Sequence, residues 1–114
     1  RRWQRVHLDF AYYKHVWFLG LVDAYYNWGD VTHIKCTTAL KTVENISSMF
    51  AAFRLPEQIV TDNGPQFMYE VPVFLRYNAV QHVKTPPYHS ASNGAAQRLV
   101  QTVMKNLVRQ LRGR

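Results

Sequence analysis

The stretch Leu-Pro-Glu-Gln-Ile-Val-Thr-Asp-Asn-Gly-Pro-Gln-Phe, residues 55–67, contains a complete change of backbone structure. Pro56 ends any helix that precedes it, because proline cannot continue a helical hydrogen-bond ladder. Residues 58–61 then have the length and apolar character of a short strand, and the Asp-Asn-Gly that follows is typical of a turn. The stretch therefore predicts a strand whose end delivers the carboxylate of Asp62.

Upstream of this stretch, the pattern predicts three strands and then a helix. Val6, Leu8 and Phe10 alternate with polar residues, and residues 16–22 are apolar on both faces, as in a strand with a neighbour on each side. A turn at 25–29 and a third strand at 31–37 complete an antiparallel meander. From Thr38 onward, apolar residues recur at three-to-four spacing, which predicts an amphipathic helix that Pro56 terminates.

Downstream, the pattern predicts a short helix near 66–78, a fifth strand at 80–84, a loop at 85–91 and a final helix. Pro72 limits the short helix, and Ser92 and Asn93 suit the start of the final one as caps. The apolar face expected for the final helix consists of Ala96, Leu99, Val100, Val103, Leu107, Val108 and Leu111. Another side, at four-residue spacing, carries Gln97, Gln101, Lys105 and Arg109.

This order of elements predicts an α/β fold with a mixed five-stranded sheet flanked by helices. It matches the ribonuclease-H-like fold of polynucleotidyl transferases. At 114 residues the chain supports one hydrophobic core, so residues 1–114 are expected to form a single domain. The 47% share of hydrophobic residues is ample for such a core.

Composition also narrows the classes of function. No apolar run reaches the ~18–20 residues that a bilayer requires, so a membrane role is not expected. The lone Cys36, expected on a strand, excludes an internal disulfide and favours an intracellular protein. The chain has 14 Lys and Arg against 7 Asp and Glu, a net charge of +7, for which a polyanion is the ordinary partner.

Asp9 and Asp62 each fall at or near the end of a predicted strand, and position 97 lies on the final helix. Three such positions would form a two-metal phosphoryl-transfer site if each were acidic, since two Mg²⁺ ions need converging carboxylates. Taken singly, Asp9 also fits a solvent-facing strand charge and Asp62 a turn former. Asp23 is expected to stabilise the hairpin in which it lies. Position 97 is a glutamine.

Four ordered motifs resemble the catalytic core of retroviral and long-terminal-repeat retrotransposon integrases, most of all the gypsy type. The strand 3–10 resembles the segment of their first acid, and residues 22–28 resemble the hairpin after it. Residues 55–67 resemble the second-acid segment, and 87–98 the loop and helix of the third acid. The similarity runs from about residue 3 to 112, which is nearly the whole chain.

The resemblance implies that Asp9 and Asp62 are the first two catalytic acids and ligands of Mg²⁺ or Mn²⁺. It places Gln97 where the family has glutamate. Losing one unit charge beside a divalent ion removes on the order of 8 kcal/mol of Coulomb attraction at ~4 Å and an effective dielectric constant of ~20. We therefore expect weakened or lost metal binding and impaired DNA integration. We also expect the chain to lack the zinc-binding and C-terminal DNA-binding modules of the complete enzyme.

The resemblance further implies DNA as the partner, contacted through its phosphates with weak sequence preference. Arg98, Gln101, Lys105 and Arg109 are the expected contacts, although a merely solvated helix face is equally consistent with the pattern. Trp3, Trp17 and Trp28 are expected to pack in the core or in turns, and Tyr88 and His89 to pack in the loop or reach a backbone. Three functions stay open: a nuclear strand transferase, a non-catalytic descendant, and a homodimerising interaction domain.

Overall fold

The computed structural model describes residues 3–85 and 91–112. Five strands form one mixed sheet in the order β3-β2-β1-β4-β5. The strands are β1 (Arg5–Tyr13), β2 (Val16–Asp23), β3 (Trp28–Ile34), β4 (Gln58–Thr61) and β5 (Gln81–Lys84). β1, β2 and β3 pair antiparallel, and β4 pairs parallel with both β1 and β5. The antiparallel meander and the five-stranded mixed sheet expected from the sequence are therefore confirmed.

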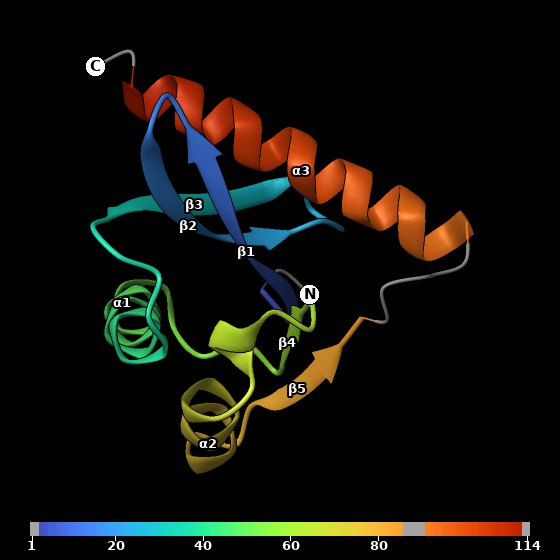
Figure 1. The fold of residues 1–114 in the computed structure, drawn as a ribbon. Coiled ribbons are helices and arrows are strands. Elements are labelled where there is room, and N and C mark those ends of the chain that lie inside the picture. Colours follow the sequence, from blue (N-terminus) through green and yellow to red (C-terminus); the bar gives the residue numbers. More distant parts are fainter. Residues whose placement is uncertain (1–2, 86–90, 113–114) are drawn as a thin grey trace.

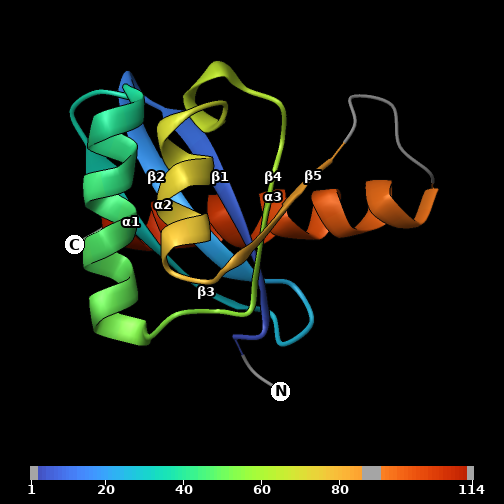
Figure 2. The same ribbon diagram turned by 90° about the horizontal axis from the view of Figure 1, so that it is seen from below.

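Three α-helices sandwich this sheet. α1 (Ala39–Phe53) and α2 (Glu70–Tyr77) lie on one face, and α3 (Ala91–Arg112) crosses the opposite face (Figures 1 and 2). A 3₁₀ turn at Pro65–Phe67 lies between β4 and α2. In the described ranges 3–85 and 91–112, no helix is long and apolar enough to cross a membrane.

Strand alternation divides the core into two layers. On the α1/α2 side, Val6 and Leu8 of β1 pack with Leu19, Ile46 and Leu75 and with the rest of the larger core cluster. On the α3 side, a smaller cluster consists of Val22, Val100, Val103 and Met104, with Ala11 and Leu107 packed against it. Because side chains of a strand alternate between faces, every second residue of β1, including His7 and Asp9, faces α3.

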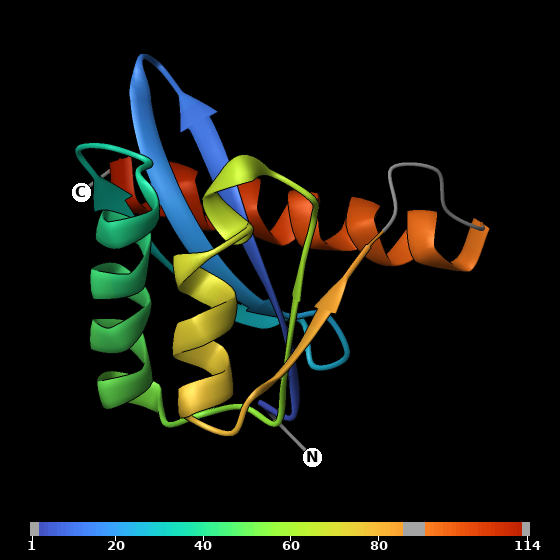
Figure 3. The ribbon, with the colours of Figure 1, turned by 60° about the horizontal axis from the view of Figure 1, so that its bottom comes forward.

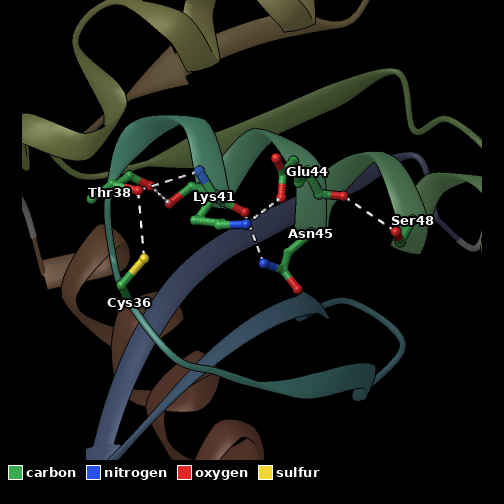
Figure 4. A network of polar contacts seen from close by, with 7 residues as sticks. Cys36, Thr38, Lys41, Glu44, Asn45 and Ser48 are labelled. Carbon is green, nitrogen blue, oxygen red and sulfur yellow. Dashed lines mark hydrogen bonds and ion pairs between the residues drawn. The ribbon is translucent and has the colours of Figure 1, made fainter.

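A polar network begins α1 and continues along its exposed side (Figure 4). Thr38 is the N-cap, and its Oγ1 accepts a hydrogen bond from the backbone N–H of Lys41 at 3.4 Å. Lys41 pairs with Glu44 at 3.1 Å, and Ser48 donates to the carbonyl of Glu44. The cap fixes where the helix starts, as expected from the change of period at Thr38. Cys36 lies in the preceding loop and not on a strand, so that expectation was wrong.

Several element boundaries differ from those expected. β3 begins at Trp28, three residues early, because Trp28 and Gly29 pair with Asp23 and Val22. The single helix expected near 66–78 is a 3₁₀ turn followed by α2, and Pro72 lies in the first turn of α2, where a missing N–H costs little.

The final helix also differs from the expected one. α3 begins at Ala91, so Ser92 and Asn93 lie within it and not ahead of it. Leu99 is 39% exposed, which contradicts its assignment to the apolar face, and Met104 takes up buried space instead. Met104 packs against Gly20 of β2, where a side-chain carbon would overlap its sulfur. The missing side chain at Gly20 therefore lets α3 lie close to the sheet.

Asp23 has the structural role expected for it. Its side chain is 2% exposed, and its carboxylate accepts hydrogen bonds from the backbone N–H groups of Trp3 at 2.6 Å and Tyr26 at 3.3 Å. These bonds tie the β2–β3 turn to the start of β1.

Candidate active site

The register between β1 and β4 places two acids side by side. The last residues that pair in this parallel ladder are His7 and Val60. Asp9 and Asp62 each lie two residues beyond that pair, so they are at the same level along the sheet. A shift of two residues also keeps the side chain on the same face, and here that face is the one covered by α3. Asp62 thus lies just past the end of β4, as expected, whereas Asp9 lies in the middle of β1, so the expectation of a strand end for Asp9 was wrong.

α3 adds the third predicted position. Asp9, Asp62 and Gln97 line one cavity of about 420 Å³, together with His7 and Gln101. Gln97 comes from the N-terminal half of α3, whose later turns are anchored on the sheet by buried Val103 and Met104. The structure therefore brings together the three positions that the sequence singled out for chemistry. His7 was missed, although alternation along β1 places it on the same face as Asp9.

The electrostatics of this cavity centre on Asp9. Burial raises the pKa of Asp9 to about 6; the Phe10 N–H, which donates to Asp9 Oδ1 at 2.9 Å, opposes the rise, and the negative charge of Asp62 adds to it. Burial also lowers the pKa of His7, with a further decrease from the neighbouring charge of Arg5. Two carboxylates that repel each other beside a neutral imidazole form a site that favours a cation.

The turn that carries Asp62 is held by several hydrogen bonds. The backbone N–H of Gly64 donates to Asp62 Oδ1 at 2.8 Å, so Asp62 also serves as the turn former that its sequence context predicted. Thr85 donates to the carbonyl of Thr61 through both its N–H and its hydroxyl, each at 2.8 Å. Thr61 Oγ1 lies 2.6 Å from His82 Nε2. These contacts fix the position of the Asp62 carboxylate relative to β5.

The donor set of the cavity fits magnesium or manganese. No three His, Cys, Asp or Glu side chains cluster as a metal site in residues 3–85 and 91–112. Asp9 and Asp62 are therefore joined by an amide, that of Gln97, rather than by a third charged ligand. Carboxylate and amide oxygens are the hard ligands that Mg²⁺ accepts, and Mg²⁺ keeps waters in its remaining positions. The set is sufficient for a metal but carries one charge fewer than three acids would.

The predicted nucleic-acid contacts lie on the exposed part of α3. Arg98, Gln101, Lys105 and Arg109 are all exposed, and Gln101 also lines the cavity with the acids. The cationic side of α3 is thus continuous with the candidate active site. Tyr88 and His89 lie outside the described residues. Trp3 is buried and packs against Trp28, as expected. Trp17 packs against Phe10 and Tyr12 near the hairpin turn, with 39% of its side chain exposed.

Comparison with known structures defines the class of fold. The chain is similar to the catalytic core domain of BIV integrase, with a TM-score of 0.72 and 18% identity over 87% of this chain and 65% of that one. It is also similar to a chain of the simian T-cell lymphotropic virus intasome in complex with PP2A regulatory subunit B56 gamma. That match has a TM-score of 0.76 and 24% identity, and covers 96% of this chain and 41% of the other. The protein has the ribonuclease-H-like fold of retroviral integrase catalytic cores.

A curated relative at the level of sequence is the Caenorhabditis elegans protein named "Uncharacterized protein K02A2.6". It is 28% identical over 109 residues, which is 94% of this chain and 9% of that protein. No family model matches the chain. The chain spans less than two thirds of each of these three relatives, and so corresponds to a part of each.

Proposed function

We propose that this chain is a polynucleotidyl-transferase core of retroelement origin, which binds DNA and has a weakened two-metal site. The observation that carries the proposal is the shared cavity, which is lined by Asp9 from the middle of β1, Asp62 from just past the end of β4 and Gln97 from α3, on an integrase-type fold. A nuclear location goes with the proposed DNA substrate. The C. elegans relative adds sequence similarity along almost the whole chain.

In this proposal Asp9 and Asp62 hold Mg²⁺ or Mn²⁺, and the amide oxygen of Gln97 is a neutral third ligand. A bound metal of this kind stabilises the charge that develops on phosphate oxygens during transfer. Asp9 must be ionised to act as a ligand, so its raised pKa makes metal affinity increase as the pH rises through about 6. His7, held neutral by its surroundings, adds no competing positive charge.

A DNA nicking and disintegration assay with Mg²⁺ and Mn²⁺ tests the proposal. We expect little or no activity from the unmodified chain, because an amide replaces the third charge. We expect activity to appear or rise in Gln97→Glu and to vanish again when Asp62→Asn is added. Robust DNA joining by the unmodified chain would contradict the claim of impairment. Inactivity of Gln97→Glu under both metals would favour a non-catalytic descendant.

DNA binding is proposed to involve the exposed side of α3. The double variant Lys105→Gln/Arg109→Gln is expected to weaken duplex binding at low salt and to reduce the salt dependence by about one unit of slope per lost phosphate contact. Fluorescence polarisation between ~50 and ~200 mM salt measures both quantities. Lys41→Gln/Arg76→Gln removes the same two charges, one Lys and one Arg, from α1 and α2 on the opposite face and serves as the control. Equal losses in both variants would mean that binding follows net charge rather than this interface.

A second candidate function is homodimerisation through an apolar groove. The groove lies between α1 and α2, has a volume of about 560 Å³, and includes Leu40, Met68, Tyr69, Val73 and Tyr77. All five side chains are exposed, from 44% at Met68 to 89% at Tyr77. Exposed apolar patches of this kind are typical of protein interfaces, since a monomer gains nothing by leaving them in water.

The dimer has its own test. We expect Val73→Glu to shift the protein toward monomer in light scattering after size-exclusion chromatography, because a charge in the groove would be costly to bury. Ser48→Glu adds the same single charge on the exposed side of α1, outside the groove, and controls for surface charge. A monomeric wild-type protein at high concentration would exclude the homodimer.

A further inference from the structure

The hairpin between β1 and β2 carries a continuous row of aromatic side chains. Phe67 and Phe10 stack with their ring centres 5.4 Å apart, and Phe10 meets the edge of Trp17 at 6.2 Å. Trp17 then contacts Tyr12 at 4.9 Å, and Tyr12 contacts His15 at 6.3 Å. Exposure increases along the row, from 1% at Phe67 to 39% at Trp17 and 56% at Tyr12. The row therefore begins in the core and ends in solvent.

The outer part of this row is partly open to solvent, although Trp17 also pairs across the sheet with Ile34 of β3. Tyr12 and Trp17 face each other across the antiparallel ladder, so their rings are held on the same face of the sheet. That end of the hairpin projects beyond α1 and the 3₁₀ turn, which cover only its inner part (Figure 3). Two large aromatic side chains held together at a projecting tip form an exposed apolar patch, which is typical of a binding site.

The charges around the tip favour a polyanion. Lys14 and His15 form the exposed turn, and the His15 ring lies beside Tyr12. The Lys14 ammonium lies 5.4 Å from the ring centre of Tyr13, which is on the opposite face of the sheet from Tyr12, so Lys14 flanks the tip at the turn. Lys35, also exposed, follows Ile34, which pairs with Trp17. No acidic residue occurs in the sequence from 10 to 22. A surface that binds protein usually combines apolar side chains with charges of both signs. The hairpin tip combines aromatic rings with positive charges, which favours a nucleic acid as its ligand.

We propose that the β1–β2 hairpin tip is a binding platform for single-stranded DNA, with Tyr12 and Trp17 as stacking surfaces and Lys14 as a phosphate contact. A single strand is favoured because its bases expose the flat faces on which aromatic rings stack, whereas a duplex keeps them covered. The inference deepens the proposed function and rests on it for the choice of nucleic acid as the partner.

The platform lies near the candidate active site. Tyr12 is three residues beyond Asp9 on the same strand, or about 10 Å at the rise of an extended chain. The two side chains are on opposite faces of the sheet, and Tyr12 is next to the last residue of β1. A strand held at the tip is thus close to the Asp9–Asp62 cavity without occupying it.

Binding of a thymidine oligonucleotide, followed by fluorescence polarisation, tests this platform. Tyr12→Thr and Trp17→Thr are each expected to weaken single-strand binding by about fivefold or more, the typical loss of one stacked base. Threonine suits a strand, and thermal melting shows whether each variant folds. Tyr25→Thr is the matched control, since Tyr25 is 87% exposed but lies at the β2–β3 turn. Its affinity should equal that of the wild type.

Tryptophan fluorescence gives a second readout. Trp17 is well exposed and Trp3 is 4% exposed, so quenching by the bound strand should be lost mainly in Trp17→Phe. Folded Tyr12→Thr and Trp17→Thr proteins that bind the strand as tightly as the wild type would overturn the proposal. So would variants that change only self-association in light scattering, because the tip would then be a protein interface.

These outcomes are separable from the failure of the proposed function. Loss of duplex binding in Lys105→Gln/Arg109→Gln tests the α3 interface alone. A protein that fails to bind duplex but whose Trp17 fluorescence is still quenched by a single strand keeps the hairpin platform and loses the α3 interface. A protein that binds duplex through α3, with single-strand affinity unaffected at Tyr12 and Trp17, loses the platform and keeps the proposed function.

Discussion

Replacing Gln97 with glutamate is expected to tighten Mn²⁺ or Mg²⁺ binding by about tenfold or more, which corresponds to ~1.4 kcal/mol. Gln97 lines the cavity with Asp9 and Asp62, so the new carboxylate adds a third negative charge where the ion binds. The direct Coulomb gain is larger, but desolvation of the carboxylate cancels much of it. Glutamine and glutamate are nearly isosteric, and the fold should be unchanged.

Isothermal titration calorimetry with Mn²⁺ measures this gain, and metal-dependent melting provides a check. Gln110→Glu adds the same charge on an exposed turn of the same helix and is the control. Its metal affinity should stay close to that of the unmodified chain. If Gln97→Glu and the unmodified chain bind metal equally, position 97 is not a ligand, and the third site residue has been wrongly assigned.

Replacing Asp9 with asparagine is expected to stabilise the metal-free protein by on the order of 2 kcal/mol at about pH 8, while abolishing metal binding. The pKa of Asp9 is raised to about 6 in the folded protein, from 3.8 in an unperturbed carboxyl. Between these two values the folded state binds more protons than the unfolded state. The free energy of unfolding therefore decreases as the pH rises through this window, and asparagine removes the decrease because it stays neutral.

Urea unfolding in the presence of a chelator, from about pH 4 to about pH 8, measures this effect. The free energy of unfolding of the wild type should decrease as the pH rises over this range, and that of Asp9→Asn should decrease less. The asparagine carbonyl can still accept the hydrogen bond that Phe10 now donates at 2.9 Å. Asp62→Asn is the comparison, because Asp62 is exposed and its replacement should abolish metal-dependent stabilisation without the same gain. A wild-type stability that rises from pH ~4 to ~6 would contradict the burial argument.

Together these two predictions describe a site whose charges oppose folding. The cavity keeps two mutually repelling acids side by side, a half-buried one in the middle of β1 and an exposed one just past the end of β4. Such an arrangement is ordinary at functional sites and is hard to explain as packing. The presence of both acids beside Gln97 thus makes the metal-binding experiment the most informative one for this chain.

Local sequence determined the order and type of the elements. Three patterns are visible within a few residues: the alternation along β1, the apolar run of β2 and the change of period at Thr38. They are local because the periods of strands and helices follow from the geometry of the backbone. The strand Gln58–Thr61 was predicted with its exact bounds, since Pro56 before it and the turn after it leave no room for another placement. The roles of Asp9 and Asp62 came instead from the resemblance to integrase cores, since each acid taken singly also fits a strand charge or a turn former.

The tertiary structure decided what depends on segments far apart in sequence. The register that places Asp9 beside Asp62 is set by the pairing of His7 with Val60, which are more than fifty residues apart in the sequence. Met104 is buried because α3 lies against Gly20 on a different element. Trp17 faces solvent because the hairpin extends past the helices that cover its inner part. Neighbours in the sequence largely specify a residue's backbone conformation. Whether its side chain is buried depends on how distant segments pack against it in the folded protein.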